Sequence, residues 1–144
     1  MGRLVGIARA PNRRAKMVEV PSVEIDFASG VAGDARGRTP GRQVTVLFRE
    51  SWDAACGELG VVLPWTTRRA NLLVEGMDVP RLGDRIGIGP VVLEVTGETD
   101  PCRVMEAAHK GLRQALTPEW RGGVCCRVRG AGTIAVGDVV RIVS

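Results

Sequence analysis

The chain has 144 residues, of which 44% are hydrophobic and 25% are charged, and these proportions are ordinary for a globular protein. They exclude wholesale disorder, collagen, coiled coils and small disulfide scaffolds. A chain of this length buries roughly two-thirds of the surface that its unfolded form exposes, so we expect a single domain over residues 1–144. The formal net charge is +4, and 18 of the 20 basic residues are Arg.

The arginines favour an anionic ligand, because the planar guanidinium group binds carboxylate or phosphate in bidentate fashion. A genome that favours Arg codons throughout would give the same composition, so this alternative stays open. No apolar stretch approaches 18 residues, and residues 1–16 contain no apolar signal-peptide segment. We therefore expect a cytoplasmic protein that has no membrane partner.

The first third of the chain has the pattern of β-strands. Apolar residues alternate over residues 3–10 and 16–26, which predicts two strands, and residues 11–14 between them have the composition of a turn. Residues 28–42 are dense in Gly and Arg and predict a long loop, of a kind that is usually functional or mobile. Residues 43–48 predict the next strand.

The middle of the chain alternates helices with strands. The apolar residues of segment 50–60 recur at helical spacing, so a short helix is predicted there, and residues 71–74 predict a strand. Segments 85–89 and 91–95 predict a hairpin. Residues 102–116 place their apolar residues on one helical face and predict a second, longer helix.

Three more strands are predicted near the end of the chain, over residues 123–129, 132–136 and 139–143, with glycines between them. At least eight short strands against two helices indicate a mainly β (α+β) fold. Such a pattern is typical of a barrel or a curled sheet rather than of alternating βα units.

The four cysteines have no C-x-x-C or other zinc-ligand spacing, so a structural zinc site is not expected. Cys102 follows a loop and begins the predicted second helix, where the helix dipole favours a thiolate. A thiolate is both a nucleophile and a soft metal ligand, although a buried cysteine at a helix start is the alternative. Cys56 lies on the apolar stripe of the first helix. Cys125 and Cys126 are adjacent in a strand and point to opposite faces.

Conventional hydrolase and nucleotide sites are not indicated. His109 is the only histidine, no G-x-S-x-G motif accompanies it, and the phosphate-binding glycine motifs of dinucleotide and triphosphate sites are absent. Arg42, the pair Arg68-Arg69, and Arg121 lie next to predicted strand ends, where guanidinium groups can bind an anion in a pocket. Solvated charges at strand ends are the alternative.

The order of motifs resembles the MOSC domain, a module named after the C-terminal part of molybdenum cofactor sulfurases. The resemblance covers about residues 25–144 and rests on GDARG, GRQVTVLF, a short helix, RRANLLVEG, LGDRIGIGPVVLEVTG, Pro101-Cys102, RGG and GTIAVGDVV. It implies a MOSC-type β-barrel of short strands with two short helices, a site for the molybdenum cofactor (molybdopterin), and one functional cysteine. In relatives a His often follows the position of Gly33-Asp34, where this chain has Ala35-Arg36.

The resemblance also implies the residues of the site. Cys102 matches the cysteine that ligates molybdenum in the reductase members and carries a persulfide in the sulfurase branch. Arg69 and Asn71 match an Arg-x-Asn element that contacts the pterin of the cofactor. Arg42 and Thr99 are expected to contribute because they lie next to matching motifs.

Our leading hypothesis is a cofactor-binding oxidoreductase that reduces a small-molecule substrate, with Cys102 as the metal ligand and an electron-transfer partner. The alternative is a sulfurtransferase in which Cys102 receives sulfur from a donor protein such as a cysteine desulfurase. Binding of nucleic acid is not expected, because two Phe and three Trp are too few and too scattered for a stacking platform.

Overall fold

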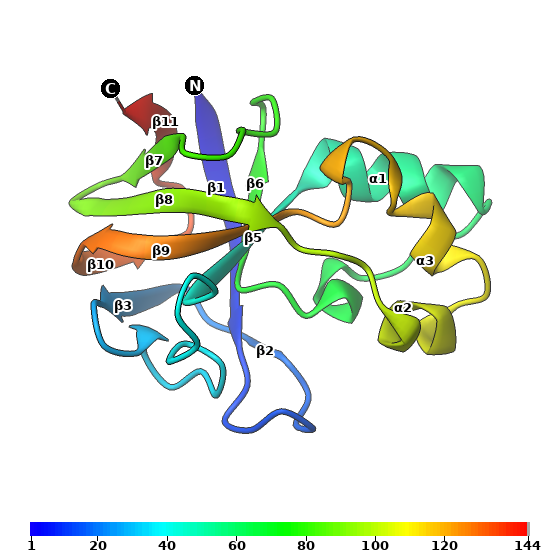
Figure 1. Cartoon of the computed structure of the whole chain (residues 1–144), viewed down its shortest axis with the longest axis horizontal. Helices are drawn as coiled ribbons and strands as arrows, with labels where there is room; N and C mark the ends of the chain where they lie inside the picture. The colour runs from blue at the N-terminus through cyan, green and yellow to red at the C-terminus, as the bar shows by residue number, and fades with distance from the viewer. Residues whose placement is uncertain (144) are drawn as a thin grey trace.

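Seven strands close into a barrel in the computed structural model, which describes residues 1–143 (Figure 1). They are β1 (Gly2–Arg9), β5 (Val44–Phe48), β6 (Leu72–Glu75), β7 (Arg85–Ile88), β8 (Val91–Glu98), β9 (Val124–Gly130) and β11 (Val139–Val143). Their order is β11, β7, β8, β9, β5, β6, β1, and the barrel closes where Gly2 of β1 pairs with Val140 of β11. The β5–β6 pair is parallel and the other pairs are antiparallel. The predicted mainly β barrel is therefore confirmed.

The remaining strands are short. In a separate sheet, β3 (Ser22–Asp26) lies between β10 (Gly132–Ala135) and β4 (Gly30–Val31), and β2 (Val18–Glu19) pairs with the end of β1. The turn after β3 is held by the Asp26 carboxylate, which accepts hydrogen bonds from the backbone N–H and the hydroxyl of Ser29.

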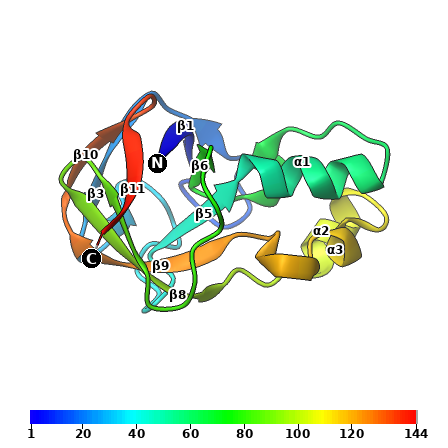
Figure 2. The same ribbon diagram turned by 90° about the horizontal axis from the view of Figure 1, so that it is seen from above.

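The helices gather on one side of the barrel (Figure 2). They are α1 (Arg49–Glu58), the 3₁₀ turn η1 (Trp65–Arg68), α2 (Arg103–Ala108), α3 (Leu112–Ala115) and the 3₁₀ turn η2 (Pro118–Trp120). Between the helices and the outer face of the barrel lies a second hydrophobic core that contains Leu47, Leu73, Trp52, Trp65, Met105 and Leu112. The helices therefore cover strands β5 and β6.

Strand β5 contributes to both cores because its side chains alternate. Val44, Val46 and Phe48 belong to the core inside the barrel, whereas Leu47 points outward to the helices. Thr45 has the same outward orientation as Leu47, since the two are separated by one residue. The outer face of β5 thus changes from apolar to polar at Thr45, beyond the edge of the helical layer.

The predicted single helix over residues 102–116 is wrong, because the structure divides it into α2 and α3 and so has three α-helices rather than two in residues 1–143. His109 is extended (φ −159°, ψ 133°), and Gly111 has φ +88°, which L side chains rarely adopt. The apolar stripe predicted for one helix is shared by two shorter helices that both pack against the barrel.

Two further predictions need correction. The strand predicted over residues 16–26 is interrupted at Pro21, which has no backbone N–H to donate to a sheet. The loop predicted over residues 28–42 contains strand β4, in which Val31 pairs with Ile25. In residues 1–143 there is also no helix with the length and apolar character needed to cross a membrane.

Candidate functional site

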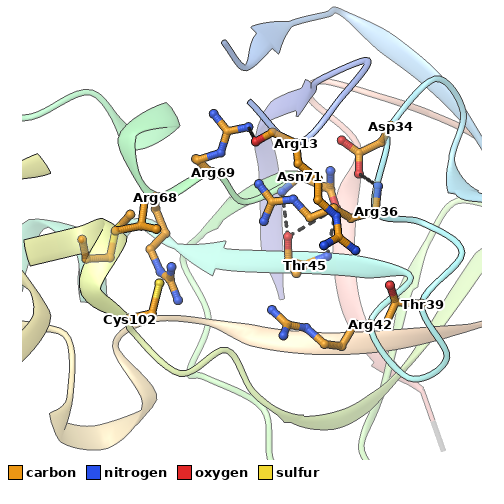
Figure 3. A pocket seen from close by; sticks show the side chains of 12 residues that line it. Arg13, Asp34, Arg36, Thr39, Arg42, Thr45, Arg68, Arg69, Asn71 and Cys102 are labelled. Carbon is orange, nitrogen blue, oxygen red and sulfur yellow. Dashed lines mark hydrogen bonds between the residues drawn. The ribbon is translucent and has the colours of Figure 1, made fainter. Parts of the chain in front are cut away.

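A cavity of about 380 Å³ opens beside Thr45, on the outer face of the barrel (Figure 3). Its walls come from the β1–β2 and β4–β5 connections, β5, η1 and α2. The lining side chains are five arginines, one carboxylate, one thiol and five others: Arg13, Arg36, Arg42, Arg68, Arg69, Asp34, Cys102, Thr39, Thr45, Asn71, Val104 and Met105. The cavity is therefore strongly positive, and its volume is in the range of ordinary small-molecule sites.

Cys102 and Arg68 lie together at one end of the cavity (Figure 3). Cys102 is exposed and immediately precedes α2, whereas the side chain of Arg68 is only 7% exposed. Arg68 donates from Nε to the carbonyl of Gly122 (3.0 Å) and from Nη2 to the carbonyl of Thr99 (2.8 Å). Burial lowers the pKa of its guanidinium, and the nearby thiols of Cys102 and Cys125 act in the opposite direction.

Arg68 has no acidic partner in the part of the chain that the structure describes, since no carboxylate lies within 4.0 Å of it. A glycine at position 122 leaves the space that its side chain occupies. A Cβ atom there would lie 3.1 Å from Nη2 of Arg68 and 2.5 Å from the Thr99 carbonyl oxygen. The RGG motif singled out from the sequence thus serves to seat a buried arginine at the thiol end of the cavity.

Asn71 forms the floor of the cavity together with Thr45. Its side-chain oxygen accepts a hydrogen bond from the Thr45 backbone N–H (3.1 Å), and its amide nitrogen donates to the Ala8 carbonyl (3.2 Å). The side chain therefore connects β5, β6 and β1 at the level where the cavity opens. One of its two amide N–H groups is used in this way, and the other makes no hydrogen bond within residues 1–143.

Arg69 points away from its neighbour Arg68 because its backbone is left-handed, with φ +64° and ψ 29°. This conformation is uncommon for a residue other than glycine and is strained. Its Nη2 donates to the backbone carbonyl of Arg13 (3.0 Å), which joins η1 to the β1–β2 connection. Two consecutive arginines thus serve different parts of the same cavity.

Arg36 lies in the β4–β5 loop, across the cavity from Cys102 (Figure 3). Burial lowers the pKa of its guanidinium, and repulsion from Arg69 lowers it further. Asp34 opposes this effect, but its oxygens already accept hydrogen bonds from the backbone N–H groups of Ala10 (3.0 Å) and Arg36 (3.3 Å). Arginines that are crowded in this way favour binding of an anion between them.

The other cysteines are buried, and their surroundings differ. Cys56 lies in the core under α1, as predicted, and burial raises the pKa of its thiol. Cys126 faces the barrel interior, where burial also raises its thiol pKa. Cys125 faces outward, and its sulfur lies 3.3 Å from the hydroxyl oxygen of Thr99. The predicted opposite orientation of the two adjacent cysteines is confirmed.

Four of the five residues expected to form the site line one cavity: Arg42, Arg69, Asn71 and Cys102. Thr99 does not line it; this residue is buried, its carbonyl binds Arg68 and its hydroxyl contacts Cys125. Arg68 was predicted only as one member of the pair Arg68-Arg69, and Arg13 and Arg36 were not among the predicted site residues. Relatives often have a His after the position of Gly33-Asp34, whereas this chain has Ala35-Arg36, and this difference could have identified Arg36.

Comparison with known proteins identifies the family. The sequence signature of the MOSC domain matches residues 33–141. The fold is similar to that of the YuaD protein from Bacillus subtilis, with 24% identity and a TM-score of 0.77 over 97% of this chain and 94% of that one. It is also similar to YiiM from Geobacillus stearothermophilus, with 18% identity and a TM-score of 0.80 over 100% of this chain and 76% of that one.

A third similar structure is YiiM from Escherichia coli, with 18% identity and a TM-score of 0.73 over 99% of this chain and 70% of that one. A comparison with curated proteins finds no match. The family signature covers most of the chain, including all the arginines of the cavity except Arg13. Because the signature matches residues 33–141, the chain belongs to the MOSC domain family.

Proposed function

We propose that this protein binds the molybdenum cofactor in the arginine-lined cavity and uses the Cys102 thiolate as a ligand of the metal. The observation that carries the proposal is the placement of an exposed thiol in a cavity with five arginines and one carboxylate. A phosphate-bearing cofactor needs positive charge, and a soft metal needs a thiolate. The cavity offers both within about 380 Å³.

The side chains of the cavity divide these tasks. The phosphate end of the cofactor is bound by positive charge from Arg36, Arg42 and Arg69. Arg36 and Arg42 lie in the β4–β5 loop and Arg69 lies at the end of η1, and all three line the cavity. The free amide N–H of Asn71 can donate to a ring acceptor. Among residues 1–143, Cys102 is the one thiol that lines the cavity, so it is the metal ligand that this chain contributes.

When bound, the cofactor supplies the redox and oxygen-atom-transfer chemistry, so we assign the protein as an oxidoreductase that reduces a small molecule. The chain itself orients the cofactor, holds positive potential around its anionic end and leaves the thiol side open to substrate. Such a reductase also needs an electron-transfer partner that supplies the electrons. Thr99 does not line the cavity, and its carbonyl holds Arg68 in place. A direct contact between Thr99 and the cofactor stays a prediction.

The proposal is tested by the molybdenum and pterin content per chain after expression in a host that makes the cofactor. We expect near-stoichiometric molybdenum in the wild type and in Cys125→Ser, and loss of molybdenum in Cys102→Ala. Cys125→Ser is the matched control because Cys125 is close to Arg68 but does not line the cavity. Absence of molybdenum from the wild type, in a host where another molybdoenzyme loads normally, would refute the proposal.

A second candidate function is sulfur carriage, in which Cys102 holds a persulfide and delivers it to a cofactor or metal-sulfur assembly. The exposure of the Cys102 thiol favours this function, because a carrier must meet both a donor and an acceptor. A cysteine desulfurase is one donor of this kind. A persulfide on Cys102 in cofactor-free protein would support this function, and its absence after incubation with a desulfurase and cysteine would count against it.

A further inference from the structure

The buried guanidinium of Arg68 has unused hydrogen-bonding capacity that faces the cavity. A guanidinium group has five N–H donors, and in residues 1–143 Arg68 uses only Nε and Nη2. No fully buried side-chain nitrogen or oxygen in this part of the chain lacks a hydrogen-bond partner. Nη1 therefore has access to open space, and the open space beside Arg68 is the cavity.

This donor group lies beside the only thiol of the cavity in the described part of the chain, and it has no carboxylate to neutralise it. An anion next to Cys102 would supply the missing negative charge and accept hydrogen bonds from Nη1. A thiolate repels an anionic substrate, so such a reaction needs nearby positive charge. Arg68 provides it at the sulfur, and Arg42 adds positive charge from the β4–β5 connection that lines the same cavity.

We propose that the substrate of the thiol is a sulfur-bearing oxyanion, of which thiosulfate is the simplest, and that Cys102 takes its outer sulfur as a persulfide. The inference rests on the proposed role in sulfur carriage and names the class of donor for it. It does not depend on the metal, because the step uses only the thiol and the arginines.

The step is balanced without an added oxidant. The Cys102 thiolate attacks the outer sulfur of thiosulfate, a new sulfur–sulfur bond forms, and the bond between the outer sulfur and the sulfonate group breaks. Sulfite leaves with the electron pair of the broken bond, and Cys102 is left as a persulfide anion. Arg68 binds the oxygens of the sulfonate group as the negative charge moves onto the departing sulfite.

The persulfide on Cys102 can be detected with a small nucleophile, because Cys102 is exposed. Cyanide attacks the outer sulfur of the persulfide, thiocyanate leaves and the thiolate is restored. Turnover of thiosulfate and cyanide to thiocyanate and sulfite therefore reports the reaction, and the mass of the Cys102 peptide reports the intermediate.

The experiment uses the full chain from a host that does not make the cofactor. Thiosulfate should add one sulfur atom to the peptide that contains Cys102, and cyanide should remove it with formation of thiocyanate. Cys102→Ser should abolish both signals. A mass gain on a peptide that carries only another cysteine, or equal turnover by Cys102→Ser, would overturn the inference.

Arg68→Gln should raise the KM for thiosulfate about tenfold and change kcat less, because the side chain binds the oxyanion. Arg68→Lys keeps the charge and should recover part of the lost affinity, which a purely structural role would not predict. Arg38→Gln is the matched control, since Arg38 is exposed in the β4–β5 loop but does not line the cavity. A wild-type KM in Arg68→Gln would overturn the assignment of Arg68.

Inorganic polysulfide separates this inference from sulfur carriage itself. If polysulfide adds sulfur to Cys102 and thiosulfate does not, the oxyanion donor is refuted while carriage stands. If neither reagent adds sulfur to Cys102, both are refuted.

Discussion

Replacement of Gly122 by alanine tests whether this glycine seats the buried Arg68. The added Cβ would lie 2.5 Å from the Thr99 carbonyl oxygen, which must then move by about 0.9 Å to reach the ordinary contact distance of 3.4 Å. That shift weakens the 2.8 Å hydrogen bond between Arg68 and Thr99. Loss of a hydrogen bond to a charged group costs about 1.5–3 kcal/mol, and overpacking costs about 1–3 kcal/mol.

We therefore expect Gly122→Ala to lower the free energy of unfolding by about 2.5–6 kcal/mol, measured by urea denaturation with tryptophan fluorescence. The control is Gly57→Ala, because no atom outside the local helix lies within 4 Å of a Cβ built at this α1 position. This control should gain up to about 1 kcal/mol from its higher helix propensity. A Gly122→Ala protein within about 0.5 kcal/mol of the wild type would refute the reasoning.

Two more predictions concern other polar side chains. Asn71→Ala should lower the free energy of unfolding by about 2–5 kcal/mol, because it leaves the Thr45 N–H and the Ala8 carbonyl without a partner; a urea midpoint equal to that of the wild type would contradict this. Hydrogen bonds from Ser29 lower the pKa of the Asp26 carboxyl group in the folded protein. The ionised carboxylate therefore stabilises the fold at any pH above the pKa that Asp26 has in the unfolded chain, and this stabilisation is lost as the pH falls through the lower pKa of the folded protein. Asp26→Asn should therefore lower the thermal midpoint at neutral pH and have less effect at about pH 3, and an equal effect at both would count against the assignment.

Much of the barrel could be predicted from the sequence, because alternation of apolar residues reports which side of a strand is buried. Strand β5 is a clear case, since Val44, Val46 and Phe48 face the interior as the pattern requires. The division of the second helix could not be predicted in the same way. Gly111 interrupts an apolar stripe that is continuous in the sequence, and a single glycine in a helical pattern is often tolerated.

The site was predicted less completely than the barrel. Cys102, Arg42 and Arg69 were noted from their positions at a helix start and at strand ends, and the resemblance to a family added Asn71; all four line one cavity. The different roles of Arg68 and Arg69 depend on the left-handed backbone at position 69, which composition and spacing do not reveal.

The pairing of β1 with β11 has a consequence for the time course of folding. Gly2 and Val140 are partners, so the barrel closes only when two segments that are 138 residues apart in the sequence meet. Contacts that join residues this far apart in the sequence form slowly, because the chain must first lose the entropy of a long loop. Strand β1 also carries Ala8, the partner of Asn71 at the floor of the cavity. The strand whose pairing closes the barrel is therefore also the strand that anchors the floor of the cavity.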